Sequence, residues 1–494
     1  MTPPTQTCTL RTGAGDLRGA LRENVRIFRG IPYAVPDTAG KRFSEAAPTP
    51  SWSGLRDATA LPAIFPQLPS RLAQVNGRGV EDNPQSEEAF LLNVWAPADA
   101  SQAPVLVFLH GGAFVSGGGT AQWYDGERLA RETGIVVVSV NYRLGALGHL
   151  CLPQAGLDGN LPVRDLLVAL QWVQRHIEAF GGNPQRVTVA GQSAGAWYAY
   201  LLGASPASKG LLRQTLLLSV PDRPPMEPET ARRLGREFLD LAGARDIATL
   251  TTSEVLNIQS SIMRRSSGFA EIGLAFYPVQ QDGLVPEWLA DYERAAAESH
   301  IEASMIGYTS EENAAFLFRS EEVLRADARR VRQWYEEKFG DRAADFYEAF
   351  AAARPAHTPY TQTLDAASFI HFKQPAMQIA HHLSAQGKPS YLYEFAYQTQ
   401  VPDLYSPHCF DLPFLFGNRD AWHDAPMLAQ TDMQHFEAVG GELRSAVGRY
   451  VKTGNPGPAA DGAWQPYSSQ APGLTRLTDR ACGAELPMPA MAKP

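Results

Sequence analysis

The chain has 494 residues, of which 44% are hydrophobic and 19% are charged, and its net charge at pH 7 is −9. This composition is typical of a soluble globular protein with a sizeable core. The negative charge argues against nucleic acid or an anionic membrane as a partner, because both require a basic protein surface. The first residues lack the basic and apolar regions of a secretory signal, and no apolar run approaches the length of a membrane span.

The cysteines also exclude some classes of protein. Cys8, Cys151, Cys409 and Cys482 lie far apart in the sequence and form no CxxC pair. This spacing predicts neither a zinc site nor a disulfide framework, and it is typical of a reducing compartment. We therefore predict a cytoplasmic protein.

The length alone would favour two domains. However, no Ser/Gly-rich linker, block of charge or internal repeat divides the chain. Since α/β enzymes with insertions reach this size as one unit, we predict a single α/β domain over residues 1–494. Two polar stretches, near 222–265 and 318–356, are predicted to be helical insertions that form a lid over the sheet.

The predicted elements follow one another in a simple order. Glycine and proline divide residues 8–60 into short segments, which predicts antiparallel strands, and residues 61–87 are predicted to be a long surface loop. Apolar strand segments then alternate with helical ones, which predicts a mostly parallel, twisted sheet with helices on both faces. The predicted strands are 91–95, 105–109, 135–140, 187–190, 304–307 and 391–395, and the main predicted helices are 163–180, 196–202 and 430–452.

One strand leads directly into a candidate nucleophile. Residues 191–195 read GQSAG, which fits G-x-S-x-G, between the apolar strand 187–190 and the helix 196–202. A sharp turn between strand and helix needs glycines where a Cβ would strike a neighbour, and it raises the serine hydroxyl at the carboxyl edge of the sheet. This context predicts Ser193 as a nucleophile; the alternative is a Gly-Ser-Gly turn without a chemical role.

A serine needs a base and an acid that orients the base. In this arrangement the partners follow the serine in the order acid, then histidine. Glu312 lies a few residues after the predicted strand 304–307 and is our candidate for the acid. Glu311 and Asp282 remain alternatives.

The base is chosen by its position in a loop. His408 follows the strand 391–395 by about a dozen residues and is our candidate. Other histidines beyond Glu312 are expected in helices, in other loops or on the surface. These are His357, His371, His381, His382, His423 and His435.

A glycine-rich segment supplies the remaining part of a hydrolytic site. Residues 110–114 read HGGAF and come directly after the strand 105–109. Attack on an acyl carbon places negative charge on its oxygen, and backbone N–H groups must point at that oxygen. We predict that Gly112, Ala113 and Ala194 donate these N–H groups.

Several motifs resemble those of one family. The resemblance covers nearly the whole chain, through 28–33 (FRGIPY), 92–95 (LNVW), 110–114 (HGGAF), 141–148 (NYRLGALG), 180–184 (FGGNP), His408 with Asp411-Leu412, Phe416-Gly417 and 452–456 (KTGNP). The chain is thereby similar to the type-B carboxylesterases, an α/β-hydrolase family that includes bacterial para-nitrobenzyl esterases and cholinesterases. The resemblance implies an α/β-hydrolase fold with helical insertions that form a lid or gorge. It implies Ser193, Glu312 and His408 as catalytic residues and Ser219 as a second serine that supports the acid.

The sequence also departs from the family pattern. Gln192 stands where relatives usually carry glutamate, and Asp411 replaces another glutamate. The motif of the acid is altered around the adjacent glutamates at 311 and 312. The cysteines of a disulfide in secreted relatives correspond here to Phe65 and Ala89.

The resemblance implies a serine carboxylesterase that acts on a small-molecule ester without a metal or an organic cofactor. The sequence does not decide between a monomer and a homodimer. Two alternatives stay open: an amidase, carbamate or thioester hydrolase with the same mechanism, and a non-catalytic binding relative. Aromatic side chains are candidates to line an apolar gorge, although each of them could instead belong to the core. They are Phe114, Trp123, Trp197, Phe276, Phe316 and Phe369.

Overall fold

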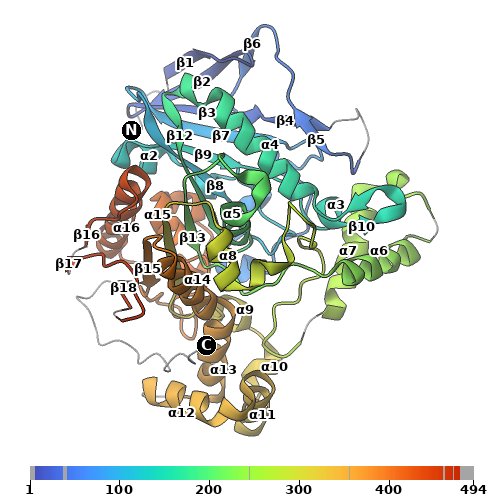
Figure 1. Cartoon of the computed structure of the whole chain (residues 1–494), viewed down its shortest axis with the longest axis vertical. Helices are drawn as coiled ribbons and strands as arrows, with labels where there is room; N and C mark the ends of the chain where they lie inside the picture. Colours follow the sequence, from blue (N-terminus) through green and yellow to red (C-terminus); the bar gives the residue numbers. More distant parts are fainter. Residues whose placement is uncertain are drawn as a thin grey trace.

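The computed structural model describes residues 6–36, 42–243, 245–266, 268–354, 357–459, 462–470 and 472–478. Within these ranges, twelve strands form one large twisted sheet through the middle of the molecule (Figure 1). In spatial order the strands are β1 (Gln6–Arg11), β2 (Asp16–Arg22), β3 (Val25–Pro32), β7 (Leu91–Pro97), β9 (Val136–Val140), β8 (Ala103–Leu109), β12 (Gly182–Gln192), β13 (Gln214–Leu218), β14 (Ser304–Thr309), β15 (Ser390–Phe395) and β18 (Leu474–Leu477), while β6 (Leu55–Asp57) pairs with β2. Short two-stranded pairs are β4 (Ala34–Pro36) with β5 (Ala46–Pro48), β10 (Cys151–Leu152) with β11 (Leu157–Asp158), and β16 (Pro458–Ala459) with β17 (Gly462–Ala463).

The sheet is antiparallel at its beginning and parallel through its centre. β1, β2, β3, β7 and β9 pair antiparallel in turn. From β9 onward, every neighbouring pair through β8, β12, β13, β14, β15 and β18 is parallel. The prediction of a mostly parallel sheet with an antiparallel first part is confirmed.

Alternating side chains of the central strands feed two hydrophobic cores. On β8, Leu106 and Phe108 point to one face, and Val105, Val107 and Leu109 point to the other, as the pleat of a strand requires. Helices cover both faces, so the central strands β8, β9, β13, β14 and β15 are buried throughout, which explains their mostly apolar sequences. One face packs against α2 (Glu127–Thr133), α15 (Leu412–Phe416) and α16 (Met433–Thr453), and the other packs against α4 (Leu161–His176), α5 (Ala194–Ala204), α8 (Tyr292–Glu298) and α14 (Gln374–Ala385).

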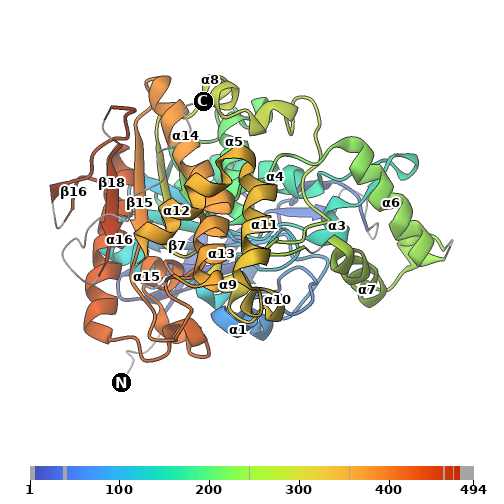
Figure 2. The ribbon, with the colours of Figure 1, turned by 90° about the horizontal axis from the view of Figure 1, so that it is seen from below.

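Both stretches predicted as insertions are helical. The first contains α6 (Pro228–Ala242) and α7 (Thr252–Met263), and the second contains α10 (Glu321–Leu324), α11 (Ala328–Phe339) and α12 (Ala343–Ala353), with α9 (Ala314–Leu317) before it and α13 (Pro359–Ser368) after it. Figures 1 and 2 show α6 and α7 together at one side of the molecule, apart from α10, α11 and α12. The side chains of α7 pack against the short helix α3 (Gly145–His149). That these helices move as a lid stays a prediction.

The prediction of a surface loop at 61–87 is wrong. This segment contains α1 (Ala73–Asn76), and the side chains of Ile64, Phe65 and Val75 are fully buried or nearly so. Its prolines interrupt any periodic pattern, but its apolar side chains pack into the main cores. We call residues 65–85 the wall segment, because it forms one side of the cavity described below.

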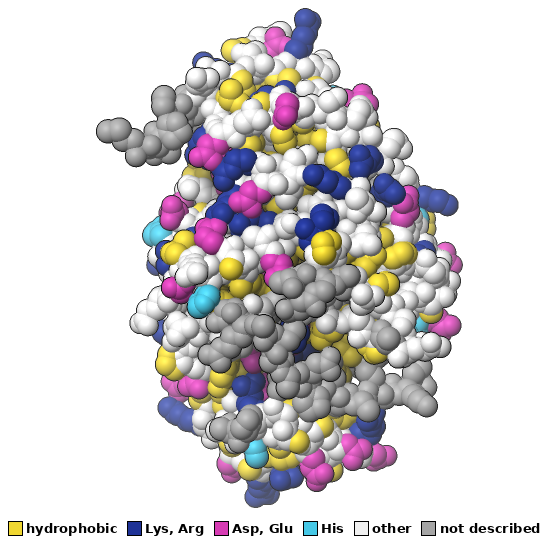
Figure 3. All heavy atoms as spheres, turned by 90° about the vertical axis from the view of Figure 1, so that its left-hand side faces the viewer, with side chains coloured by type: hydrophobic (Ala, Val, Ile, Leu, Met, Phe, Trp, Pro, Cys, Tyr) yellow, Lys and Arg dark blue, Asp and Glu magenta, His cyan; other side chains and the backbone are white. Residues whose placement is uncertain are grey.

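The surface and the cysteines give further constraints. None of the helices within the described ranges is long and apolar enough to cross a membrane. On the face shown in Figure 3, acidic and basic side chains lie interspersed. Cys8, Cys151 and Cys409 are free thiols, and Cys482 lies outside the described residues.

Candidate active site

The turn that carries Ser193 is fixed by steric contacts. β12 ends at Gln192 and α5 begins at Ala194, and Ser193 between them has φ 56° and ψ −121°, a strained backbone for a residue other than glycine. A Cβ on Gly191 would collide with the carbonyl group of Gly195, and a Cβ on Gly195 would collide with the carbonyl oxygen of Leu109. The two glycines of the motif therefore allow the tight turn from strand to helix that presents Ser193.

Two further candidates meet at the ends of neighbouring strands. Glu312 follows β14 and His408 lies in the loop after β15, and both side chains are almost completely buried. The Nδ1 atom of His408 lies 2.5 Å from Oε2 of Glu312, and Oε1 of Glu312 accepts the N–H of Thr309 at 2.8 Å. This pairing orients the imidazole and places its proton on Nδ1, so that Nε2 is left as an acceptor.

The alternatives for the acid lie elsewhere. Glu311 is buried rather than solvent-facing, and it forms an ion pair with Arg354 at 3.1 Å. Asp282 is exposed in a turn. Among the three candidates, the structure therefore brings only Glu312 to His408.

Burial and nearby groups act in opposite directions on the pKa of His408. Burial disfavours the imidazolium and lowers the pKa of His408, whereas the Cys409 sulfur and the Glu312 carboxylate outweigh burial and raise this pKa above its usual value. Burial also raises the pKa of Asp411 to about 7, and the negative charge of Glu312 acts in the same direction. The Tyr393 hydroxyl lies 3.4 Å from Oδ2 of Asp411. The imidazole of His408 thus lies beside the Glu312 carboxylate, which it contacts, and near Asp411, whose pKa is raised to about 7.

Sequence reasoning noted Gln192 only as a departure from the family and missed its contact. Nε2 of Gln192 lies 3.0 Å from Nε2 of His408, and both residues are buried. When the imidazole is neutral with its proton on Nδ1, the amide of Gln192 donates and Nε2 of the imidazole accepts. The residue before the serine therefore occupies the acceptor atom that a catalytic base would use. Its place beside Ser193 in the motif was the available signal.

The glycine-rich loop after β8 has an unusual backbone. Gly112, Ala113 and Phe114 have positive φ angles of 120°, 55° and 63° in succession. Within the described part of the chain, the N–H groups of Gly112 and Ala113 have no acceptor. The N–H of Ala194, as the first residue of α5, has no preceding turn to bond with. Three N–H groups are thus available where sequence reasoning placed the donors to an oxyanion.

Gln67 holds this loop against the wall segment. Its Oε1 accepts the N–H of Gly117 at 2.6 Å, and its Nε2 donates to the carbonyl oxygens of Gly117 at 2.7 Å and Phe65 at 3.1 Å. The side chain of Gln67 thereby makes three hydrogen bonds and is itself buried. The glycine-rich loop and the wall segment are consequently fixed to one another.

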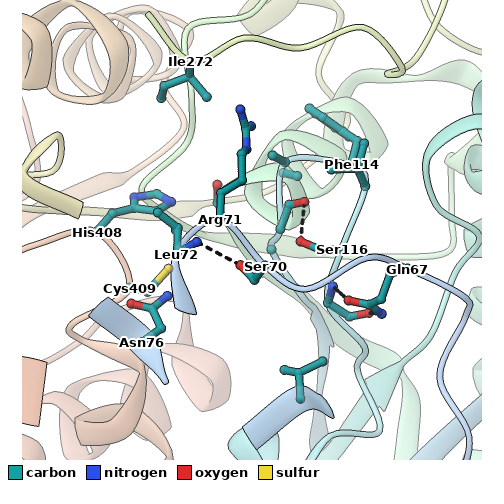
Figure 4. Close-up of a pocket in the computed structure, with 18 of the residues that line it drawn as sticks. Gln67, Ser70, Arg71, Leu72, Asn76, Phe114, Ser116, Ile272, His408 and Cys409 are labelled. Carbon is teal, nitrogen blue, oxygen red and sulfur yellow. Dashed lines mark hydrogen bonds between the residues drawn. The ribbon is translucent and has the colours of Figure 1, made fainter. Parts of the chain in front are cut away.

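These groups open onto one cavity of about 500 Å³. Ser193, His408 and the residues of the three N–H groups line it, together with Phe114, Trp123 and Phe316 from the predicted aromatic set. Figure 4 shows the side chains of His408, Cys409 and Phe114 around this space. The rings of Phe316 and Phe372 pack against the imidazole of His408, with centroids 5.3 Å and 4.7 Å from it. Phe372 was not among the predicted residues.

The other three aromatic predictions are wrong, because these side chains pack in the cores and do not line the cavity. Trp197 lies behind Phe114, with ring centroids 5.8 Å apart, and its Nε1 donates to the carbonyl oxygen of Arg223 at 2.7 Å. Phe276 belongs to the cluster under α6 and α7. Phe369 packs against the rings of the second insertion, among them Phe346 at 5.8 Å.

Ser219 is also not placed as predicted. It follows β13 with φ 55°, and its N–H donates to the carbonyl oxygen of Gly307 at 2.7 Å. Its buried Oγ has no hydrogen-bond partner among the described residues, so it makes no hydrogen bond with Glu312. The backbone of Ser219, rather than its hydroxyl, joins the neighbouring strand ends.

Known proteins resemble this chain along its whole length. The model of the carboxylesterase family matches residues 6–492. The chain is 32% identical to phenmedipham hydrolase of Pseudarthrobacter oxydans, over 96% of this chain and 95% of that protein. It is also 32% identical to the para-nitrobenzyl esterase of Bacillus subtilis (strain 168), over 93% and 92% of the two chains. The solved structure of a carboxylesterase of Geobacillus stearothermophilus at pH 6.2 is similar with a TM-score of 0.82 and 29% identity, over 95% of this chain and 96% of that one.

Proposed function

Since the chain belongs to the carboxylesterase family and is a carboxylic-ester hydrolase, we propose that Ser193 forms an acyl-enzyme, with His408 as the base and Glu312 as its orienting acid. The predicted family and the predicted α/β-hydrolase fold are confirmed by the same findings. We also propose that the small-molecule ester is cleaved in the cytoplasm.

The observation that carries this mechanism is the buried His408–Glu312 pair beside the strained Ser193 on one cavity. Glu312 holds Nδ1, and a shift of Nε2 from the Gln192 amide to the Ser193 hydroxyl starts the reaction. Ser193 Oγ then attacks the ester carbonyl while Nε2 takes its proton, and Glu312 stabilises the imidazolium.

The free N–H groups of Gly112, Ala113 and Ala194 support the second half of the proposal. They stabilise the negative charge that develops on the carbonyl oxygen, and loss of one such donor costs about a hundredfold to a thousandfold in rate. His408 protonates the departing alcohol and then activates water, which releases the acid and restores Ser193.

A fluorophosphonate probe tests the nucleophile directly. We expect the wild type to be labelled and to show a burst of alcohol release with an activated ester. Ser193→Ala should lose both labelling and turnover, the latter by a factor of about 10⁴ or more. Ser260→Ala serves as a control, because Ser260 also lines the cavity, and it should keep the label. Wild-type turnover in Ser193→Ala would overturn the proposal, and absence of labelling in the wild type would favour a non-catalytic binding relative.

A second candidate function differs from the first in the type of bond that is cleaved. Phenmedipham hydrolase and para-nitrobenzyl esterase are named for different substrates. Membership of the family therefore does not determine which leaving group this enzyme releases. The same Ser193 chemistry would serve an amide, a carbamate or a thioester. Turnover of an ester, an amide, a carbamate and a thioester that share one acyl group decides between these functions.

A further inference from the structure

Three arginines from separate segments line the cavity without an acidic partner. We call them the rim arginines: Arg71 of the wall segment, Arg223 after β13 and Arg264 at the end of α7. Within the described ranges, none of the three forms an ion pair with a carboxylate. In the part of the chain that the structure describes, the guanidinium of Arg71 donates only to the carbonyl oxygen of Gly273, at 3.3 Å.

The other two rim arginines also contact neutral groups. Arg264 donates to the hydroxyls of Ser260 at 2.8 Å and Ser261 at 3.1 Å. Arg223 lies over the ring of Tyr277 at 5.7 Å, and its buried Nε has no hydrogen-bond partner among the described residues. Among the described residues, neither guanidinium is therefore neutralised by a carboxylate.

The cavity contains little acid to balance them. Its lining includes two carboxylates: Glu81 is paired with Arg78 at 2.6 Å, and Asp222 accepts the hydroxyl of Tyr292 at 2.8 Å. This contrasts with the net charge of −9 and with the mixed charges on the face in Figure 3. Arg71 and Arg264 are exposed and Arg223 is half-buried, so water solvates these charges, while no carboxylate of the described residues neutralises them. A solvated guanidinium without an acidic partner can bind a carboxylate that a ligand brings.

Figure 4 shows where this charge points. The side chain of Arg71 extends between His408 and Phe114 toward Ile272, on the same cavity as Ser193. A guanidinium binds a carboxylate with two parallel hydrogen bonds, which fix both position and orientation. We propose that this enzyme prefers esters that carry a carboxylate, which Arg71 binds with support from Arg223. This inference rests on the proposed function and names the substrate class of the same site.

Matched ester pairs test the inference, because the members of each pair differ mainly in charge. One pair carries the charge in the acyl group (4-nitrophenyl hydrogen glutarate and its methyl ester), and the other carries it in the alcohol (4-carboxyphenyl butyrate and its methyl ester). We expect the wild type to have a higher kcat/KM for the charged member of at least one pair. In that pair, Arg71→Gln should lower the ratio of charged to neutral kcat/KM by about tenfold to a hundredfold, mainly through KM. Added salt should lower the wild-type ratio as well.

The controls separate this inference from the proposed function. Arg175→Gln makes the same change in net charge on an exposed helix position outside the cavity lining, and it should leave the ratio within about twofold. Arg223→Gln serves as a second variant, should Arg71→Gln fail to fold, and it should lower the ratio in the same direction. A wild type that prefers the neutral member of both pairs, or ratios unchanged by both arginine variants, would overturn the inference. Failure of the wild type to cleave any of the four esters would instead contradict the proposed function.

Discussion

At the floor of the cavity, Ser193 and the glycine-rich loop are held by backbone sterics, and His408 is held by a buried carboxylate. At the rim, by contrast, Arg71, Arg223 and Arg264 come from separate segments and have no acidic partners in the described residues. The backbone of the floor is thus held in place by the protein itself, whereas the guanidinium groups of the rim lack a carboxylate partner among the described residues.

This difference between floor and rim indicates that the reaction and the choice of substrate depend on different residues. Groups that stabilise a transition state must be positioned before the substrate arrives. Groups that select a substrate gain their energy from partners that the substrate brings, so they remain unsatisfied in its absence. We therefore expect changes at the floor to act on kcat and changes at the rim to act on the choice of ester.

We expect the largest effect on activity from a substitution of Glu312 at the floor. Glu312→Gln removes the charge that orients His408 and stabilises its imidazolium, and we expect kcat/KM to fall by about a thousandfold to ten-thousandfold. Steady-state kinetics with an activated neutral ester measure this loss. Glu311→Gln is the matched control, since its carboxylate pairs with Arg354, and its kcat/KM should fall by less than about tenfold. Equal losses in the two variants would contradict the assignment of the acid.

A pair of phenylalanine variants tests which aromatic side chains belong to the site. Phe369 packs in the core, so Phe369→Ala should lower the free energy of unfolding by about 3–5 kcal/mol. Phe316 lines the cavity and packs on His408, so Phe316→Ala should lower kcat/KM by about tenfold with a smaller loss of stability. Denaturant unfolding and ester kinetics on both variants separate the two effects. The reverse pattern would show that the two rings have been assigned to the wrong environments.

Asp411 makes the stability of the floor depend on pH. Its pKa is raised to about 7 in the folded protein, so between about pH 4 and 7 the folded state holds a proton that the unfolded state has released. Stability from this group is therefore lost as the pH rises, by about 1.4 kcal/mol per pH unit over that window.

Asp411→Asn cannot titrate, so its free energy of unfolding should increase relative to the wild type from pH 5 to 7 and stay level above that. Urea unfolding at a series of pH values measures the difference between the two proteins. Parallel curves for the two proteins would show that Asp411 is ionised in the folded state throughout.

The smallest expected effect concerns the residue before the nucleophile. Gln192→Glu places a carboxylate about 3 Å from Nε2 of His408, which stabilises the imidazolium and raises its pKa. Because the base acts when it is unprotonated, the acid limb of the kcat/KM profile should move to higher pH by about one unit. Gln192→Met lacks the charge and should not move the limb upward. An unchanged limb in Gln192→Glu would mean that Gln192 does not face His408 in solution.

The sequence predicted the floor better than the rim, for physical reasons. The turn at Ser193 depends on glycines a few residues apart, and the order of acid and histidine follows from the order of the strands, so local patterns carry this information. Whether Trp197 or Phe316 faces a cavity depends on which side of its helix meets the core, and residue type does not show this. The sequence predicted the wall segment as a surface loop from its prolines and its lack of periodicity. This prediction failed because the segment is buried by residues that are distant in the sequence. The contact of Gln192 and the lack of a partner for Arg71 likewise emerge only when distant segments meet.

The side chain of Gln67 links the wall segment to the glycine-rich loop by hydrogen bonds. Its amide bonds to both backbone groups of Gly117, a few residues beyond the N–H groups that we propose as donors to the reacting oxygen. We therefore expect a substrate that displaces the wall segment to shift those N–H groups as well. The shape of an ester should then affect kcat in addition to KM, which a comparison of binding alone would not detect.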